Sequence, residues 1–200
     1  MPVILHRPYA GESSYCGVSQ PDSPRFTGPL AFIAGPIMGA PDFQTPAGAA
    51  IVAAMPENEM VHIADPRWTN IPPDGGRLAP NHQRAWEKRH YRAAARLGER
   101  GVVLFYIAAE TSEAPVPNRP GRAYGQGTRS EFSEVIGMMQ TANHPVQLVL
   151  GIDAAHSGTG LGEYRHTAAE FGIPIHEGLQ PTCQAAAALL INGLRAQPAV

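Results

Sequence analysis

The stretch GVVLFYI, residues 101–107, is a strongly apolar run around which the rest of the chain can be arranged. Apolar runs also occupy residues 30–35, 60–65 and 145–151. Continuous runs of this length are typical of strands buried on both faces of a parallel sheet. A shorter run at residues 173–176 contains Pro174, which places it at an edge of the sheet. The sequence therefore predicts five strands.

Helical patterns alternate with these strands. They cover residues 46–55, 81–97, 164–171 and 181–194, and a further helix begins within residues 125–131. This alternation predicts an α/β fold: a doubly wound, flavodoxin- or Rossmann-like, five-stranded parallel sheet with helices on both faces. The segment 108–124 has three prolines and no periodicity. A loop of this length inside a compact domain is usually functional or disordered.

The first 29 residues differ in composition from the rest of the chain. They are rich in Pro, Gly and Ser and contain one short apolar segment, residues 3–5. We expect an N-terminal extension over residues 1–29, which could supply an edge strand, and one α/β domain over residues 30–200. A chain of 200 residues is long enough for a single domain with a substantial core.

Composition argues against several classes of partner. The 15 basic and 17 acidic residues give a net charge of -2, which offers no electrostatic basis for binding nucleic acid or a membrane surface. There is no signal-peptide pattern and no apolar run that approaches a membrane span. Cys16 and Cys183 could form one disulfide, but two reduced thiols in a cytosolic protein are the favoured reading. The histidines show no metal-ligand spacing, so we expect a cytoplasmic protein with no metal and no cofactor.

The stretch GQGTRSEFSEVIG, residues 125–137, carries the main candidate site. Its glycines and hydroxyl residues open a helix whose free backbone N–H groups can bind an anion or a sugar hydroxyl. Glu131 is expected in the first turn, where the helix dipole favours the ionised carboxylate. It is a candidate nucleophile, or it is only the capping-box partner of Thr128, three residues earlier. One helix start could hold both roles.

Ligands of parallel α/β sheets bind beyond the carboxyl ends of the strands. The Gly35-Pro36 turn, Asp65 and the glycine-rich start of the helix are all expected at that edge. The sequence therefore predicts a pocket there, with Glu131 in its wall.

Several of these segments resemble the nucleoside 2-deoxyribosyltransferase-like family, which includes deoxynucleoside monophosphate N-glycosidases. FIAGPI at residues 32–37 is similar to the family's opening strand and to the turn that follows it beside the sugar site. QRAWE at residues 83–87 is similar to a helix found in one branch of the family. Residues 102–107 resemble the central strand, and TRSEFSE at 128–134 the turn with the nucleophilic glutamate. The likeness spans residues 30–190 approximately. It implies a homodimer or higher homo-oligomer.

The resemblance also implies a reaction. It is the cleavage of the N-glycosidic bond of a nucleoside or nucleoside 5′-monophosphate, with transfer of the (deoxy)ribosyl group to water or another base. Such cleavage passes through an oxocarbenium-like transition state. Glu131 would attack or stabilise C1′, and Asp65 or Glu87 would protonate the leaving base. Asp65 could instead be a turn residue before Pro66, and Glu87 a solvated helix residue.

The remaining candidates would bind substrate. The turn at residues 35–37 would border the sugar, and the glycine-rich helix start at residues 125–130 would bind a 5′-hydroxyl or 5′-phosphate. The indole of Trp86 could stack on the base or belong to the core. The residues are Gly35, Pro36 and Ile37; Gly125, Gly127, Thr128, Arg129 and Ser130; and Trp86.

Two other functions stay open. The pattern Gly-x-Gly-Thr-x-x-Glu at residues 125–131 also resembles the phosphoribohydrolases that release cytokinin bases from their monophosphates. That family prefers a Pro-Gly-Gly start, where this chain has Tyr124-Gly125-Gln126-Gly127. The other reading is a catalytically inert nucleotide-binding or sensor module with the same fold.

Overall fold

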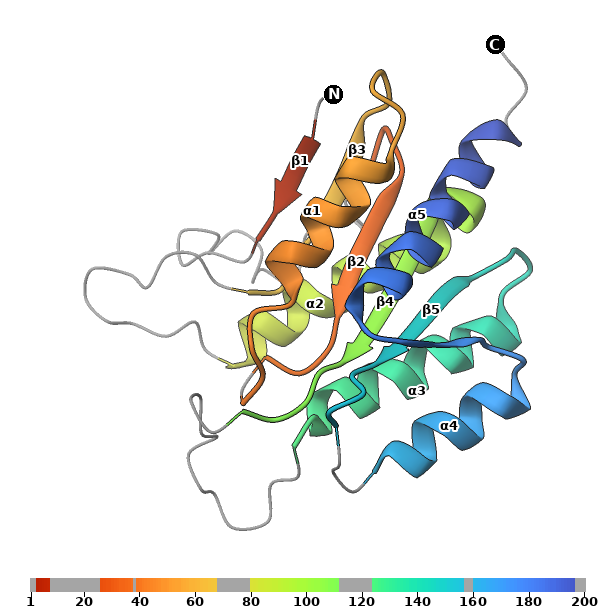
Figure 1. Cartoon of the computed structure of the whole chain (residues 1–200). Helices are drawn as coiled ribbons and strands as arrows, with labels where there is room; N and C mark the ends of the chain where they lie inside the picture. The colour runs from red at the N-terminus through yellow and green to blue at the C-terminus, as the bar shows by residue number, and fades with distance from the viewer. Residues whose placement is uncertain are drawn as a thin grey trace.

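The computed structural model describes residues 3–7, 26–37, 39–67, 80–111, 124–156 and 160–196. They form an α/β fold on a six-stranded parallel sheet (Figure 1). The strands are β1 (Val3–His6), β2 (Leu30–Ala34), β3 (Val61–Ala64), β4 (Gly101–Ile107), β5 (Gln147–Ile152) and β6 (Ile175–Glu177). They lie in the order β1-β3-β2-β4-β5-β6. The predicted α/β class and parallel sheet are confirmed.

The number of strands differs from the five predicted. The additional strand is β1, which pairs in parallel with β3 and places Ile4 opposite His62. It has only four residues, and the sequence around it is rich in Pro, Gly and Ser, so it shows too little periodicity to be counted as a full strand. In the sheet it covers backbone groups of β3 that would otherwise be unpaired. At the other edge lies β6, directly after Pro174, as predicted.

Helices cover both faces of the sheet. On one face, α1 (Gln44–Ala54) and α5 (Leu179–Arg195) share a core with Ile33 and Leu104; Figure 1 shows both helices across the near side of the sheet. On the other face, α2 (Pro80–Arg96), α3 (Gln126–Thr141) and α4 (Leu161–Glu170) share a core with Phe32 and Phe105. Neighbouring residues of a strand enter different cores because their side chains point to opposite faces.

The two central strands are buried along their whole length. Every residue of β2 and β4 is buried, and each large apolar side chain there contributes about 1.5–3 kcal/mol of transfer free energy. A short 3₁₀ turn, Gly98–Arg100, joins α2 to β4. This rigid centre carries the loops that leave the carboxyl ends of the strands.

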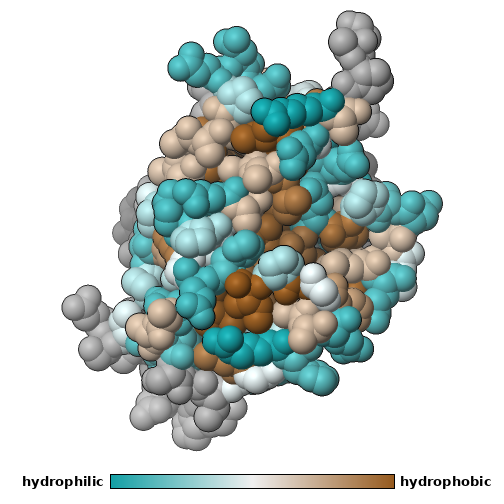
Figure 2. All heavy atoms as spheres, turned by 45° about the vertical axis from the view of Figure 1, so that its right-hand side comes forward, coloured by the Kyte–Doolittle hydropathy of each residue, from teal (hydrophilic) through white to brown (hydrophobic). Residues whose placement is uncertain are grey.

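The surface view in Figure 2 shows hydrophilic side chains interspersed with apolar ones on one face of the molecule. No helix in the described ranges is long and apolar enough to cross a membrane. Most of the predicted loop at residues 108–124 lies outside the described residues, as do residues 8–25 of the predicted extension.

Candidate active site

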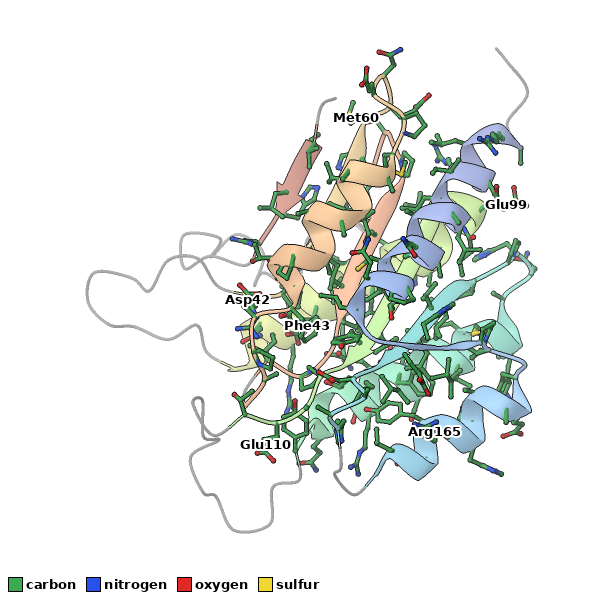
Figure 3. The ribbon with its side chains drawn as sticks, viewed as in Figure 1. Asp42, Phe43, Met60, Glu99, Glu110 and Arg165 are labelled. Atoms are coloured by element: carbon green, nitrogen blue, oxygen red, sulfur yellow. The ribbon has the colours of Figure 1, made fainter. Side chains whose placement is uncertain are left out.

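A small pocket lies at the edge of the sheet where β2, β4 and β5 end. In Figure 3, Met60 and Glu99 mark the opposite edge, whereas Phe43 and Glu110 lie on the pocket's side. The pocket is lined by strand ends (Pro36, Ile107), by the start of α3 (Gly125, Arg129) and by the start of α4 (Gly160, Tyr164). This is the edge at which parallel α/β sheets hold their ligands.

Gly35 allows the end of β2 to approach β4 at this edge. Its φ of +150° is a conformation that residues with side chains rarely adopt. A Cβ atom on Gly35 would overlap both the carbonyl oxygen of Tyr106 and the ring of Phe43. The chain then turns so that Pro36 lines the pocket, and Ile37 next to it is partly buried. The segment predicted to border a sugar therefore lies at the pocket because position 35 is a glycine.

Glu131 lies further into α3 than predicted. The helix begins at Gln126, after Gly125 in the left-handed conformation with φ of 65°. Counted from Gln126, Glu131 is the sixth helical residue, and the first turn contains no acidic residue. The N-cap residue is Gly125, which has no side chain, and not Thr128, so the predicted capping box of Thr128 and Glu131 is wrong. The left-handed glycine starts the helix before Thr128, which becomes a buried helical residue.

The Glu131 side chain meets Glu87 of α2, one of the two predicted proton donors. A side-chain hydrogen bond joins the two carboxyl groups. Gln83 Nε2 donates a further hydrogen bond of 2.9 Å to Glu87 Oε1. Glu87 is 8 % exposed and Glu131 is partly buried. Two carboxyl groups can share a hydrogen bond only if one of them carries a proton.

Burial and mutual repulsion both disfavour charge on this pair. Burial, followed by the charge and the hydrogen bond of Glu87, raises the pKa of Glu131 to about 9. Burial also raises the pKa of Glu87. At neutral pH the pair therefore holds one proton, as closely spaced carboxyl groups do. The prediction that the helix start keeps Glu131 ionised is wrong, because Glu131 lies beyond the first turn and beside a second carboxyl group.

Charged side chains hold α2 and α3 together next to the carboxyl pair. Glu134 of α3 accepts a 2.6 Å hydrogen bond from Arg92 Nε and lies 3.7 Å from Lys88 Nζ. Neither Glu131 nor Glu87 lines the pocket itself. Tyr164 does line it, and its pKa is raised first by burial and then by the charges of Glu163 and Glu131. Arg129, two residues before Glu131 on α3, also lines the pocket.

Asp65, the other predicted proton donor, belongs to a different group of residues. It directly follows β3 and is 1 % exposed. Arg7 Nη2 lies 2.7 Å from one carboxylate oxygen, and the backbone N–H of Arg67 donates a 2.9 Å hydrogen bond to the other. Burial raises the pKa of Asp65, and these two partners oppose the shift. Among the described residues no contact joins Asp65 to Glu131, so the geometry brings Glu87 and not Asp65 to the predicted nucleophile.

Arg129, one of the predicted binding residues, lines the pocket. Its guanidinium packs against Gly160 so closely that a Cβ atom on that glycine would overlap it. It also forms a side-chain hydrogen bond with Tyr164. Gly127 and Ser130, by contrast, are exposed on α3, and Ser130 Oγ lies 3.5 Å from the main-chain oxygen four residues before it.

Trp86 lies in the core of this structure. It is 4 % exposed, and its ring stacks on His90 with the ring centroids 3.9 Å apart. The ring of Phe32 on β2 lies 6.4 Å away on the sheet side. Contact of Trp86 with a substrate base therefore stays a prediction.

Two tyrosines of the pocket, Tyr124 and Tyr164, were not among the predicted site residues. The Tyr124 hydroxyl donates a 2.8 Å hydrogen bond to the main-chain oxygen of Ala108, and its ring lies 5.7 Å from that of His156. His156 follows β5 and also lines the pocket. The position of Tyr124 in the sequence could have indicated that it lies at the pocket, because it directly precedes Gly125, the glycine before α3.

No cluster of three or more His, Cys, Asp or Glu side chains in the described ranges has the geometry of a metal site. The sequence matches no protein-family model and no curated protein.

Proposed function

We propose that this protein cleaves the N-glycosidic bond of a nucleoside or nucleoside 5′-monophosphate, with Glu131 as the nucleophile. The observation that carries the proposal is the hydrogen-bonded pair of the partly buried Glu131 and the buried Glu87, with Glu131 on α3, the helix whose start lines a pocket at the carboxyl edge of the sheet. Glycosidic bond cleavage uses two carboxyl groups of which one carries a proton. Strongly shifted carboxyl groups in a pocket are candidates for such a role.

The reaction needs the shared proton on Glu87. The Glu131 carboxylate then attacks C1′ while the bond from C1′ to the base nitrogen breaks, and the bonding electrons leave with the base. The Glu87 carboxyl group donates its proton to the departing base. The covalent glycosyl-enzyme is then opened by water or by a second base, and Glu87 recovers a proton from the incoming group. Proton transfer along the existing hydrogen bond converts the resting pair into this reactive form.

The start of α3 and the start of α4 support a substrate with a 5′-phosphate. Both helices begin after a left-handed glycine, Gly125 and Gly160, and both starts line the pocket with Arg129 between them. Helix starts carry free N–H groups and partial positive charge, and guanidinium binds phosphate through a planar set of donors. We therefore propose that a nucleoside 5′-monophosphate is a better substrate than the free nucleoside.

An inert nucleotide-binding module is the second candidate. The raised pKa of Glu131 favours it, because in the resting pair Glu131 is the more strongly shifted group and a protonated carboxyl group is a poor nucleophile. A phosphoribohydrolase acting on cytokinin-type nucleotides would use the same carboxyl pair on a ribosyl substrate. We also propose that the protein is a homodimer or larger homo-oligomer in the cytoplasm, which light scattering and fractionation can test.

The function is tested by incubating the protein with a panel of nucleosides, deoxynucleosides and their 5′-monophosphates and measuring free base by chromatography. Release of free base from at least one compound supports an enzyme. Whether the compounds that react carry ribose or deoxyribose then distinguishes a ribosyl from a deoxyribosyl substrate. Added free bases distinguish transfer from hydrolysis. Ligand binding without release from any compound would leave the inert module.

The nucleophile is tested by Glu131→Gln. An amide of the same shape cannot attack C1′, so kcat should fall on the order of 10³-fold or more. Glu170→Gln, on the exposed end of α4, is the matched control and should keep the wild-type rate. Activity of Glu131→Gln near the wild-type level would refute the role of Glu131.

A further inference from the structure

Three histidines from three different elements gather around Phe26 at the β1 side of the sheet. His6 Nε2 of β1 lies 3.0 Å from His62 Nδ1 of β3, and their rings stack with centroids 5.2 Å apart. The ring of His90 of α2 lies 5.8 Å from that of His6. Phe26 packs edge-on against His6 at 5.3 Å and against His62 at 5.1 Å. His6, His62 and His90 are named the histidine cluster below.

Two members of the histidine cluster are buried, and the third, His6, is partly buried. His62 is 5 % exposed and His90 is 3 % exposed. His90 Nδ1 forms a 2.8 Å hydrogen bond with the main-chain oxygen of Trp86 and its ring stacks on the indole. His62 Nε2 is buried without a hydrogen-bond partner in the described part of the chain. A proton added here would charge a group that has little polar surrounding to stabilise it.

The strand β1 has few other attachments to the fold. It consists of four residues and pairs with β3. Its apolar side chains Val3, Ile4 and Leu5 are 41, 40 and 52 % exposed, so their burial contributes little. Among the described residues its other contacts come from His6, within the cluster, and from Arg7, which forms an ion pair with Asp65 and donates a 3.1 Å hydrogen bond to Thr45 Oγ1.

We propose that residues 3–7 form an acid-sensitive latch: the uncharged histidine cluster holds β1 on β3, and proton uptake by the cluster releases β1 while the rest of the sheet stays folded. The inference does not depend on the proposed reaction. Release would uncover the outer edge of β3 and remove Arg7 from Asp65, which lies at the same edge of the sheet as the pocket.

The direction of the pH dependence follows from the cluster. Burial, and then the charge of His62, lowers the pKa of His6 to about 4. Burial, together with His6 and Arg89, lowers the pKa of His90 to about 4, and burial lowers that of His62. His6 leaves with β1, so its pKa returns toward the ordinary value of about 6.5, whereas His62 and His90 stay on β3 and α2 and only lose the neighbouring His6 ring. The released state therefore binds more protons between pH 6.5 and 4, so the latch weakens as the pH falls through this window.

The other charged groups near β1 do not drive the release. Arg7, which is bound to Asp65, and Arg89, which acts on His90, are the nearby arginines. Burial raises the pKa of Asp65, so the attached state takes up this proton more readily and Asp65 opposes release. Asp42, a charge near Asp65, has its pKa lowered by hydrogen bonds from Thr45 and by nearby arginines, although burial opposes this shift. Release in acid is thus assigned to the histidine cluster.

Hydrogen exchange of two matched backbone amides tests the latch in the full chain. The N–H of Asp65 donates a 3.0 Å hydrogen bond to the main-chain oxygen of His6, and the N–H of Asp153 donates an equivalent 3.0 Å bond to that of Ile107. Only the first crosses to β1. After correction for the intrinsic rate, protection of Asp65 should fall from pH 6.5 to 4, by up to about tenfold per pH unit for each proton taken up. Protection of Asp153 should stay constant.

Two variants assign the effect to the histidines. His6→Gln keeps a hydrogen-bonding group and His90→Phe keeps the ring stacked on Trp86, and each removes one titrating group. His6→Gln should make the protection of Asp65 less dependent on pH, by about the tenfold per pH unit that one proton carries. His90→Phe should have the same direction with a smaller size, because His90 stays on α2 when β1 is released. The control His166→Gln, on the exposed side of α4, should behave as wild type. The latch is refuted if Asp65 and Asp153 lose protection together, or if both cluster variants keep the wild-type pH dependence.

Discussion

At the scale of single residues, the protonation of Glu131 is governed by Glu87 more than by its own helix. Burial raises the pKa of Glu131, and the charge and hydrogen bond of Glu87 raise it further, while the helix start lies too far away to offset them. Replacing Glu87 by Gln removes the neighbouring charge and supplies an N–H donor. The pKa of Glu131 should therefore fall from about 9 toward its ordinary value without reaching it, since burial remains.

Carbon-13 NMR of the glutamate side-chain carboxyl groups measures this titration directly and needs no substrate. Glu134→Gln is the control, because Glu134 makes the smallest contribution to the shift and its replacement should lower the pKa much less. An unchanged pKa in Glu87→Gln would show that the two carboxyl groups are not coupled.

Gly35 and Gly137 offer a second test at this scale. Gly35→Ala places a Cβ atom against the Tyr106 carbonyl oxygen and the Phe43 ring at a φ that favours glycine, so it should destabilise the fold by about 1–3 kcal/mol or more. Gly137→Ala, in α3 where a Cβ atom meets nothing, should instead stabilise it by about 0.5–1 kcal/mol. Urea unfolding of both variants gives the comparison, and equal effects of the two would contradict the packing at Gly35.

At the scale of elements, the sequence predicted most of what buries apolar surface. The runs at residues 30–35, 60–65, 101–107 and 145–151 form β2, β3, β4 and β5, with small differences at their ends. Short, continuous apolar runs between helices are typical of strands buried on both faces of a parallel sheet. Pro174 correctly marked an edge. The strand β1 was underestimated because its signal is short and its stability comes from β3, a partner far away in the sequence.

The candidate site was predictable only in part. The sequence named Glu131, Glu87, Pro36, Gly125 and Arg129, and the structure places them in the carboxyl pair or the pocket wall. It misplaced the start of α3, because the left-handed conformation of one glycine outweighed a plausible capping box. Of the two candidate proton donors it placed Asp65, at a strand end, ahead of Glu87, because the packing of α2 against α3 that brings Glu87 to Glu131 has no signal in the sequence. The histidine cluster was missed for the same reason: strand order brings its members together.

At the scale of the whole molecule, two groups of buried side chains make stability depend on pH in opposite directions. The histidine cluster has lowered pKa values, so it destabilises the folded state as the pH falls from 6.5 toward 4. The carboxyl pair has raised pKa values, so the folded state holds more protons than the unfolded chain between the ordinary carboxyl pKa and about 9. Above pH 6.5 the pair acts first, and near pH 9 the Cys183 thiol, whose pKa burial raises to about 11, acts in the same direction, so the free energy of unfolding should decrease as the pH rises.

The melting temperature should therefore fall from pH 6.5 to 9, by about 2–4 °C for each kcal/mol lost in a chain of this size. Glu131→Gln removes the titrating group with the larger shift and should flatten this decline, whatever its effect on the melting temperature at pH 6.5. Glu163→Gln, on the exposed side of α4, should keep the wild-type slope. Calorimetry at several pH values measures both slopes, and an equal alkaline decline in wild type and Glu131→Gln would mean that the pair holds no proton above pH 6.5. Both groups would then be carboxylates at neutral pH, and the site would lack the proton that the departing base needs.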